Sequence, residues 1–234
     1  GSANTVGSIN STVSVNTTSG FSIVSYTGTG SAATIGHGLG VSPACIIIKN
    51  TSDSGGVDWF VYHQSMGATK RLKLNQTVAS ATSSFINNTT PSPTVFNTEG
   101  GGASGVNANN YIAYCFAEKQ GFSKFGSYVG NGSTNGTFIY TGFSPAFIMV
   151  KRTDSTSDWT IFDNKRPGYN LINKALYPNG EWAEGTGDAL DFTSNGFKWR
   201  VNSSAYNGSG GDYIYMAFAE APLVGTNNVP ANAR

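Results

Sequence analysis

The chain has 234 residues, of which 12% are charged and 30 are glycine, and its formal net charge is +1. Lys and Arg do not cluster, so the sequence lacks the basic face that nucleic-acid binding needs, and no apolar run approaches the roughly 18 residues of a membrane span. The 38% apolar content, with 12% aromatics, excludes a disordered chain and favours many short strands joined by Gly, Asn and Ser turns.

Residues 1–19 are predicted to form a polar segment ahead of the first folded unit. They show neither a charged start nor an apolar stretch, so we expect no signal peptide. The first strong element is IGHGLGVSPACIIIK, from Ile35 to Lys49. Its glycines and its Ser-Pro-Ala step predict a turn that enters a strand. The continuous apolar run that follows is typical of a strand covered on both faces.

The later elements of the first half return about 100 residues further on. SPACIIIK (42–49) returns as SPAFIMVK (144–151), and NYIAYCFAE (110–118) returns as DYIYMAFAE (212–220). Between these blocks, DWFVYH returns as DWTIFD in the same order. Such order at a nearly constant offset predicts a duplicated unit of roughly 100 residues. The expected organisation is an N-terminal segment at 1–19, a first repeat at 20–119, a second repeat at 120–222 and a C-terminal tail at 223–234.

The shared blocks predict an all-β fold. They are rich in β-branched and aromatic residues, and turns of Asp, Ser and Gly separate them. The best helical candidate, 171–177, is short. We therefore expect two tandem antiparallel β-sandwich units, jelly-roll-like, that arose by internal duplication. One large sandwich that pools the strands of both halves is the alternative.

The two copies test the roles of the cysteines. Cys45 aligns with Phe147, and Cys115 aligns with Ala217, so the fold needs no disulfide bridge. Two side chains that face each other in a core can be exchanged for one larger and one smaller side chain, because their total volume is kept. We therefore predict that the two cysteines are buried and that their side chains face each other.

The histidines give little support for catalysis. In the second copy the position of His37 holds Ile139, whereas the following Gly40 and Pro43 recur there. This favours a structural turn with a histidine in one copy alone. His63 is likewise replaced, by Asp163, and no nucleophile-elbow motif occurs. We expect no catalytic residue and no cofactor.

Acidic residues gather in the divergent part of the second copy. Paired carboxylates could hydrolyse a glycosidic bond, but an acidic solvated loop is the more ordinary explanation. The Asp-rich segments 53–58 and 154–158 could offer oxygen ligands to Ca²⁺, yet they do not follow the EF-hand pattern, and we expect turns without a metal. The carboxylates considered for hydrolysis are Glu181, Glu184, Asp188 and Asp191.

Aromatic residues in Gly/Asn-rich loops give the best functional hint. A flat apolar ring with polar neighbours suits a sugar, whose C–H face stacks while its hydroxyls form hydrogen bonds. Trp182, in NGEWAEG, is the expected exposed ring, whereas Trp199 is better explained as strand packing. The candidate ligand contacts are Trp182, Tyr177, Glu181, Asp188, Arg200 and Tyr206.

The repeated frame resembles a repeat of tail-fibre-like bacteriophage proteins, notably marine ones. The resemblance rests on GFSIVSYTGTGS, IGHGLGVSPACIIIKN and NYIAYCFAE with their second copies, and on the ending YIYMAFAEAPLVGTNNVPANAR. It runs from about Gly7 to Arg234. In that family the repeat often follows a laminin-G or concanavalin-A-like lectin domain.

The resemblance implies a β-sandwich virion protein displayed on a tail fibre or another external structure, without enzymatic activity. Its partners would be a host-surface glycan or receptor and other virion subunits. A homo-oligomer, trimeric in such fibres, is expected, with no nucleic acid and no membrane insertion. Two rivals remain: a structural capsid or tail protein that binds only neighbouring subunits, and a polysaccharide depolymerase that uses paired carboxylates.

Overall fold

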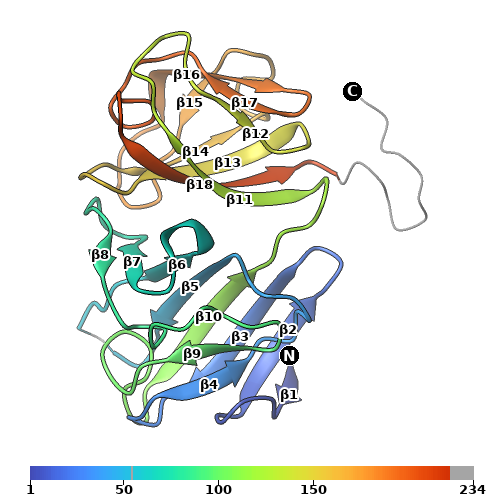
Figure 1. Cartoon of the computed structure of the whole chain (residues 1–234), viewed down its shortest axis with the longest axis vertical. Coiled ribbons are helices and arrows are strands. Elements are labelled where there is room, and N and C mark those ends of the chain that lie inside the picture. Colours follow the sequence, from blue (N-terminus) through green and yellow to red (C-terminus); the bar gives the residue numbers. More distant parts are fainter. Residues whose placement is uncertain (54, 222–234) are drawn as a thin grey trace. The chain divides into compact units, whose positions relative to one another are not determined.

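The computed structural model describes residues 1–53 and 55–221, and the part of the chain it describes is built from antiparallel strands (Figure 1). Two compact units divide it: Gly1–Asn75 with Ser80–Glu118, and Gln76–Ala79 with the chain from Lys119 on. The predicted all-β fold of antiparallel sheets is therefore confirmed. Only one short 3₁₀ turn, Gln64–Met66, interrupts the strands described here.

The first unit contains an eight-stranded sheet in the order β1-β2-β3-β10-β5-β6-β7-β8, and a separate β4-β9 pair. Its core lies between the large sheet, the β4-β9 pair and the loops that carry Phe85 and Ala103. The strands are β1 (Ser2–Asn4), β2 (Ser11–Asn16), β3 (Phe21–Thr27), β4 (Ala33–Gly36), β5 (Cys45–Asn50), β6 (Phe60–His63), β7 (Lys70–Lys73), β8 (Ala81–Thr82), β9 (Val95–Thr98) and β10 (Asn110–Phe116).

The second unit is a sandwich of two four-stranded sheets, in the orders β11-β18-β13-β14 and β12-β17-β16-β15. Its core fills the space between them with Ile148, Phe162, Leu190, Phe197 and Trp199 among others. The strands are β11 (Ser123–Val129), β12 (Phe138–Tyr140), β13 (Pro145–Arg152), β14 (Trp159–Asp163), β15 (Ile172–Ala175), β16 (Gly185–Thr193), β17 (Gly196–Trp199) and β18 (Asp212–Ala219).

The two units repeat the same strand order in one sheet, β3-β10-β5-β6 and β11-β18-β13-β14. They also repeat a tyrosine contact. The rings of Tyr26 and Tyr111 stack with centroids 5.1 Å apart, and those of Tyr128 and Tyr213 stack at 5.0 Å. In each unit the first tyrosine hydroxyl donates to a loop carbonyl 78 residues further along the chain, at 2.9 and 2.7 Å. The two units thus share a strand order and a tyrosine contact.

A second repeated contact explains the Asp-Trp step of both copies. The Asn75 amide accepts from the backbone N–H of Trp59 and donates to Asp58, at 3.0 and 3.1 Å. Asn179 makes the same two bonds, to the N–H of Trp159 and to Asp158, at 2.8 Å each. One side chain thus satisfies a strand-end donor and holds the preceding turn.

Two expectations differ from the structure, and a third falls outside the described residues. Residues 1–19, expected ahead of the first unit, contribute β1 and β2 to its large sheet, because the alternating Ser11, Val13 and Val15 fit beside β3. The helical candidate at 171–177 contains strand β15 instead. The expected tail at 223–234 lies outside the described residues.

The cysteines are buried, as predicted, and both are free, but they do not face each other. Cys115 on β10 pairs with Ile46, and Cys45 pairs with Phe116. Directly opposed residues share one face of a sheet and successive residues alternate, so the two thiols point to opposite faces. Burial raises the pKa of the Cys115 thiol to about 12, which leaves it an unreactive core group.

Candidate functional site

The loop between β15 and β16 carries an aromatic pair. The rings of Tyr177 and Trp182 meet edge to face, with centroids 5.7 Å apart and planes at 86°. Trp182 is 58% exposed, whereas Tyr177 is half-buried and packs against the core of the second unit. The loop therefore presents a large indole on a tyrosine that is itself anchored, which is a preferred geometry for two rings.

Local sequence explains why this loop has a defined shape. Asn179 anchors its start on Trp159 and Asp158, and the N–H of Gly180 donates to the carbonyl of Tyr177 at 3.1 Å. A Cβ atom on Gly180 would overlap the ring of Trp182. A side chain at this position would therefore force the indole to move, because the ring lies directly over the glycine backbone.

Ion pairs lie at the end of the same loop. Glu184 accepts from Arg166 at 2.8 Å and from Lys174 at 3.0 Å, and Arg166 also pairs with Asp163 at 2.7 Å. Hydrogen bonds from Arg166 and Lys174 lower the pKa of Glu184. A general acid for glycoside hydrolysis needs a raised pKa, so this carboxylate is shifted in the opposite direction. Asp191 is likewise paired, with Arg200 at 2.6 Å.

The structure brings only part of the predicted contact set together. Tyr177, Glu181 and Trp182 share the β15–β16 loop, and Glu181 is exposed there. Arg200 follows β17 and pairs with Asp191 on β16. Asp188 belongs to β16, but its side chain lies outside the part that the structure describes.

Tyr206 is buried, which corrects its prediction as a ligand contact. It is 3% exposed, and its ring stacks on that of Trp199 with centroids 5.0 Å apart. Trp199 is fully buried, as its position in a strand predicted. The polar neighbours of Tyr206 in the sequence suggested a surface loop, but the ring turns inward because the core between the two sheets accepts it.

Sequence reasoning missed the cations beside the aromatic loop. Arg166 also donates to the backbone carbonyl of Lys174 at 2.9 Å, and it is held by four groups from three segments of the chain. Arg166 lies 18 residues before Glu184 in the sequence, so no local pattern linked the two. A search of the divergent segments for charged residues present in one copy alone, and not only for aromatic residues, would have found Arg166.

No group of three or more His, Cys, Asp or Glu side chains suited to a metal occurs among the described residues. The aspartates of the two Asp-rich turns have protein partners instead: Asp58 pairs with Lys73 at 2.8 Å, and Asp154 pairs with Arg152 at 2.7 Å. No helix in the described part is long and apolar enough to cross a membrane.

His37 is a structural residue of the first unit. It is fully buried, its Nδ1 accepts from the N–H of Leu39 at 3.2 Å, and its Nε2 lies 3.1 Å from the carbonyl of Ser92. The ring therefore carries its proton on Nε2 and closes the turn that leads towards β5. Burial lowers its pKa.

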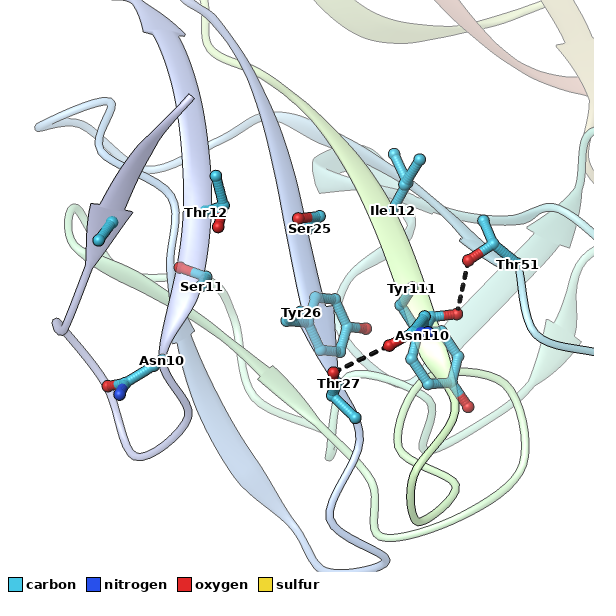
Figure 2. A pocket seen from close by; sticks show the side chains of 11 residues that line it. Asn10, Ser11, Thr12, Ser25, Tyr26, Thr27, Thr51, Asn110, Tyr111 and Ile112 are labelled. Atoms are coloured by element: carbon cyan, nitrogen blue, oxygen red, sulfur yellow. Dashed lines mark hydrogen bonds between the residues drawn. The ribbon is translucent and has the colours of Figure 1, made fainter.

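A depression of about 450 Å³ lies on the exposed face of β2, β3 and β10 in the first unit (Figure 2). The polar groups that line it are neutral, and some of them form hydrogen bonds with one another. Thr27 donates to Asn110 Oδ1 at 2.9 Å, and Thr51 donates to the Asn110 carbonyl at 3.0 Å. The rings of Tyr26 and Tyr111 are buried in the core. The depression thus offers hydroxyls and amides but neither a charge nor an exposed ring.

Comparison with known proteins gives one family. No curated protein and no solved structure matches the chain. The model of a family described as a domain of unknown function, DUF7483, matches residues 1–222, which covers both units. The chain therefore belongs to the DUF7483 family.

Proposed function

We propose that this chain is a non-enzymatic adhesion module of a bacteriophage tail fibre or related virion structure, and that it binds a host-surface glycan through the β15–β16 loop. The observation that carries the proposal is the 58% exposed Trp182, held edge to face on Tyr177. An exposed indole in a defined loop costs little to order on binding and offers a flat apolar surface to a sugar ring.

The virion assignment is supported by the resemblance of the repeated blocks to tail-fibre repeats. We also propose that the two units arose by internal duplication, which is supported by the strand order and the tyrosine contacts that recur in both units. The proposal also includes a homo-oligomer of this chain, a trimer by analogy with such fibres, and contacts with other virion subunits. Neither membrane insertion nor nucleic-acid binding is part of it.

The two rival functions have less support. A depolymerase needs a carboxylic acid with a raised pKa, whereas Glu184 and Asp191 are paired with cations. A purely structural subunit would use its exposed rings against neighbouring subunits. That function predicts no binding to isolated glycans.

The first prediction is that Trp182→Ala abolishes or weakens adhesion. We expect at least about a tenfold loss of affinity for the polysaccharides that the unaltered chain binds on an array of bacterial surface glycans, because truncation removes the stacking surface. Stability should change by less than about 0.5 kcal/mol, since the side chain is mostly exposed. Glycan arrays, host-cell binding and thermal unfolding measure these effects.

Two variants control this experiment. Trp182→Phe retains a ring and should keep most of the affinity, and Val129→Ala removes a 56% exposed side chain elsewhere in the second unit without effect. Equal glycan binding by the unaltered chain and Trp182→Ala would exclude the loop as the site. Absence of any glycan or cell binding would favour the structural alternative.

A further inference from the structure

Strand β12 presents two aromatic rings to solvent. Phe138 is 45% exposed and Tyr140 is 65% exposed, whereas Ile139 between them is 5% exposed and belongs to the core of the second unit. Side chains alternate along a strand, so the two rings lie on the outer face of the β12-β17-β16-β15 sheet. Their Cα atoms are about 7 Å apart along the strand.

The strand register places polar and small residues beside these rings. Phe138 lies opposite Lys198 on β17, and Lys198 lies opposite Asp191 on β16. Tyr140 lies opposite Gly196, and the edge of the Phe138 ring lies over this glycine, since a Cβ there would stand 3.1 Å from Phe138 Cε2. We call this set, Phe138, Tyr140, Gly196, Lys198 and the Asp191–Arg200 pair, the β12 face.

The β12 face carries a positive charge. Asp191 pairs with Arg200 at 2.6 Å, so these two charges compensate each other, and the Arg200 side chain remains 43% exposed. Lys198 takes part in none of the ion pairs formed among the described residues. The face therefore combines two exposed rings with a lysine available to an anion and an arginine beside it.

The first unit shows that the fold does not require these rings. Ile35 pairs with Phe96 as Ile139 pairs with Phe197, so Thr34 and Gly36 of the first unit stand at the positions of Phe138 and Tyr140. A Cβ on Gly36 would lie 2.7 Å from the carbonyl of Val6 and 2.8 Å from the Asn4 amide, so the N-terminal segment packs directly on that face. In the second unit, aromatic side chains occupy the face that the N-terminal segment covers in the first unit.

We propose that the β12 face is a second binding site and that it takes an acidic saccharide, one whose sugar rings carry a carboxylate. The C–H faces of sugar rings would stack on Phe138 and Tyr140, Lys198 would bind the carboxylate, and Arg200 with Asp191 would hydrogen-bond neighbouring hydroxyls. A packed chain segment is disfavoured, because the aromatic rings fill the volume that backbone occupies on the first unit. The site is separate from the β15–β16 loop and does not depend on it.

Paired probes test this site on the whole chain. Uronic-acid oligosaccharides (galacturonate, glucuronate and mannuronate) and sialyl oligosaccharides are titrated by calorimetry, each beside its methyl ester, which keeps the ring and removes the charge. We expect at least one acid to bind more tightly than its ester, with affinity falling as salt rises. Tyr140→Ala should weaken that binding by about tenfold, and Lys198→Ala should reduce the preference for acid over ester severalfold.

Three comparisons make the outcome decisive. Trp182→Ala should leave uronate binding unchanged, and Tyr140→Ala should leave binding at the β15–β16 loop unchanged, so each site can fail without the other. Tyr140→Phe keeps the ring and should retain most of the affinity. Absence of binding to every acidic probe, or unchanged binding in Tyr140→Ala, overturns the proposal. A change of sedimentation in Tyr140→Ala without a change of glycan binding also overturns it, in favour of a protein contact.

Discussion

At the scale of single residues, equivalent positions of the two units separate what the fold needs from what one unit alone uses. Tyr26 and Tyr128 make the same stack and the same hydroxyl bond, so this residue type serves the fold. Ile35 pairs with Phe96 as Ile139 pairs with Phe197, and both isoleucines are buried. Their neighbours change from Thr34 and Gly36 to the exposed rings of Phe138 and Tyr140, which no core requirement explains.

The paired tyrosines give a matched prediction. Tyr26→Phe and Tyr128→Phe each remove one buried hydroxyl and leave a loop carbonyl without its donor, and each should cost about 1–2 kcal/mol of unfolding free energy. Because the geometry is nearly the same, we expect similar losses in the two variants. Urea unfolding measures them. A loss in only one variant would show that the two contacts are not energetically equivalent.

His37 should make the first unit sensitive to mild acid. Burial holds its pKa below the ordinary 6.5, so the unfolded chain takes up a proton before the folded chain does. Its contribution to stability is therefore complete above pH 6.5 and is lost as the pH falls towards the folded-state pKa.

We expect His37→Gln to be less stable at pH 7.5 but to lose less stability between pH 7.5 and 5 than the unaltered chain. Urea unfolding at several pH values measures both effects, with His63 kept in both proteins. Parallel pH curves for the two proteins would show that His37 does not cause this sensitivity. The carboxylates with lowered pKa, such as Asp58, Asp154 and Asp163, act at lower pH and leave this window unaffected.

At the scale of elements, the β15–β16 connection shows how a loop acquires a fixed shape. Asn179 anchors one end, the Glu184 ion pairs hold the other, and Gly180 gives room for the indole. In the first unit the connection that follows β7 also begins with an anchoring asparagine, Asn75, but it then continues through the short strand β8. The divergence therefore begins just after the shared asparagine.

Gly180→Ala should displace the indole without unfolding the chain. The added Cβ would overlap the Trp182 ring, so the ring must move off Tyr177. We expect a change in acrylamide quenching of tryptophan fluorescence and a glycan affinity lower by at least severalfold, with a melting temperature close to that of the unaltered chain. The same variant in the Trp182→Phe background reports whether the quenching change comes from this indole. Unchanged quenching would mean that the loop accommodates a side chain at this position.

Strand type was predictable for the repeated blocks, because continuous apolar runs and Asp-Trp turns have a local physical meaning. The partners of those strands were not. The pairing of β2 with β3 depends on a polar alternation, Ser11 to Asn16, that a solvated segment would also show. Tyr206 was misjudged for the same reason, since polar neighbours in the sequence do not reveal on which side of a loop the core lies.

At the scale of the whole molecule, the amino-acid sequence by itself determined the class of fold, the recurrence of its elements and the secondary importance of the histidines and cysteines. These depend on composition, periodicity and comparison of one half with the other. Only the tertiary structure decided which rings are exposed, which carboxylates are neutralised and which strands complete each sheet. The physical reason is that ion pairing and strand pairing join residues far apart in the chain, as Arg166 with Glu184 and Phe138 with Lys198 show.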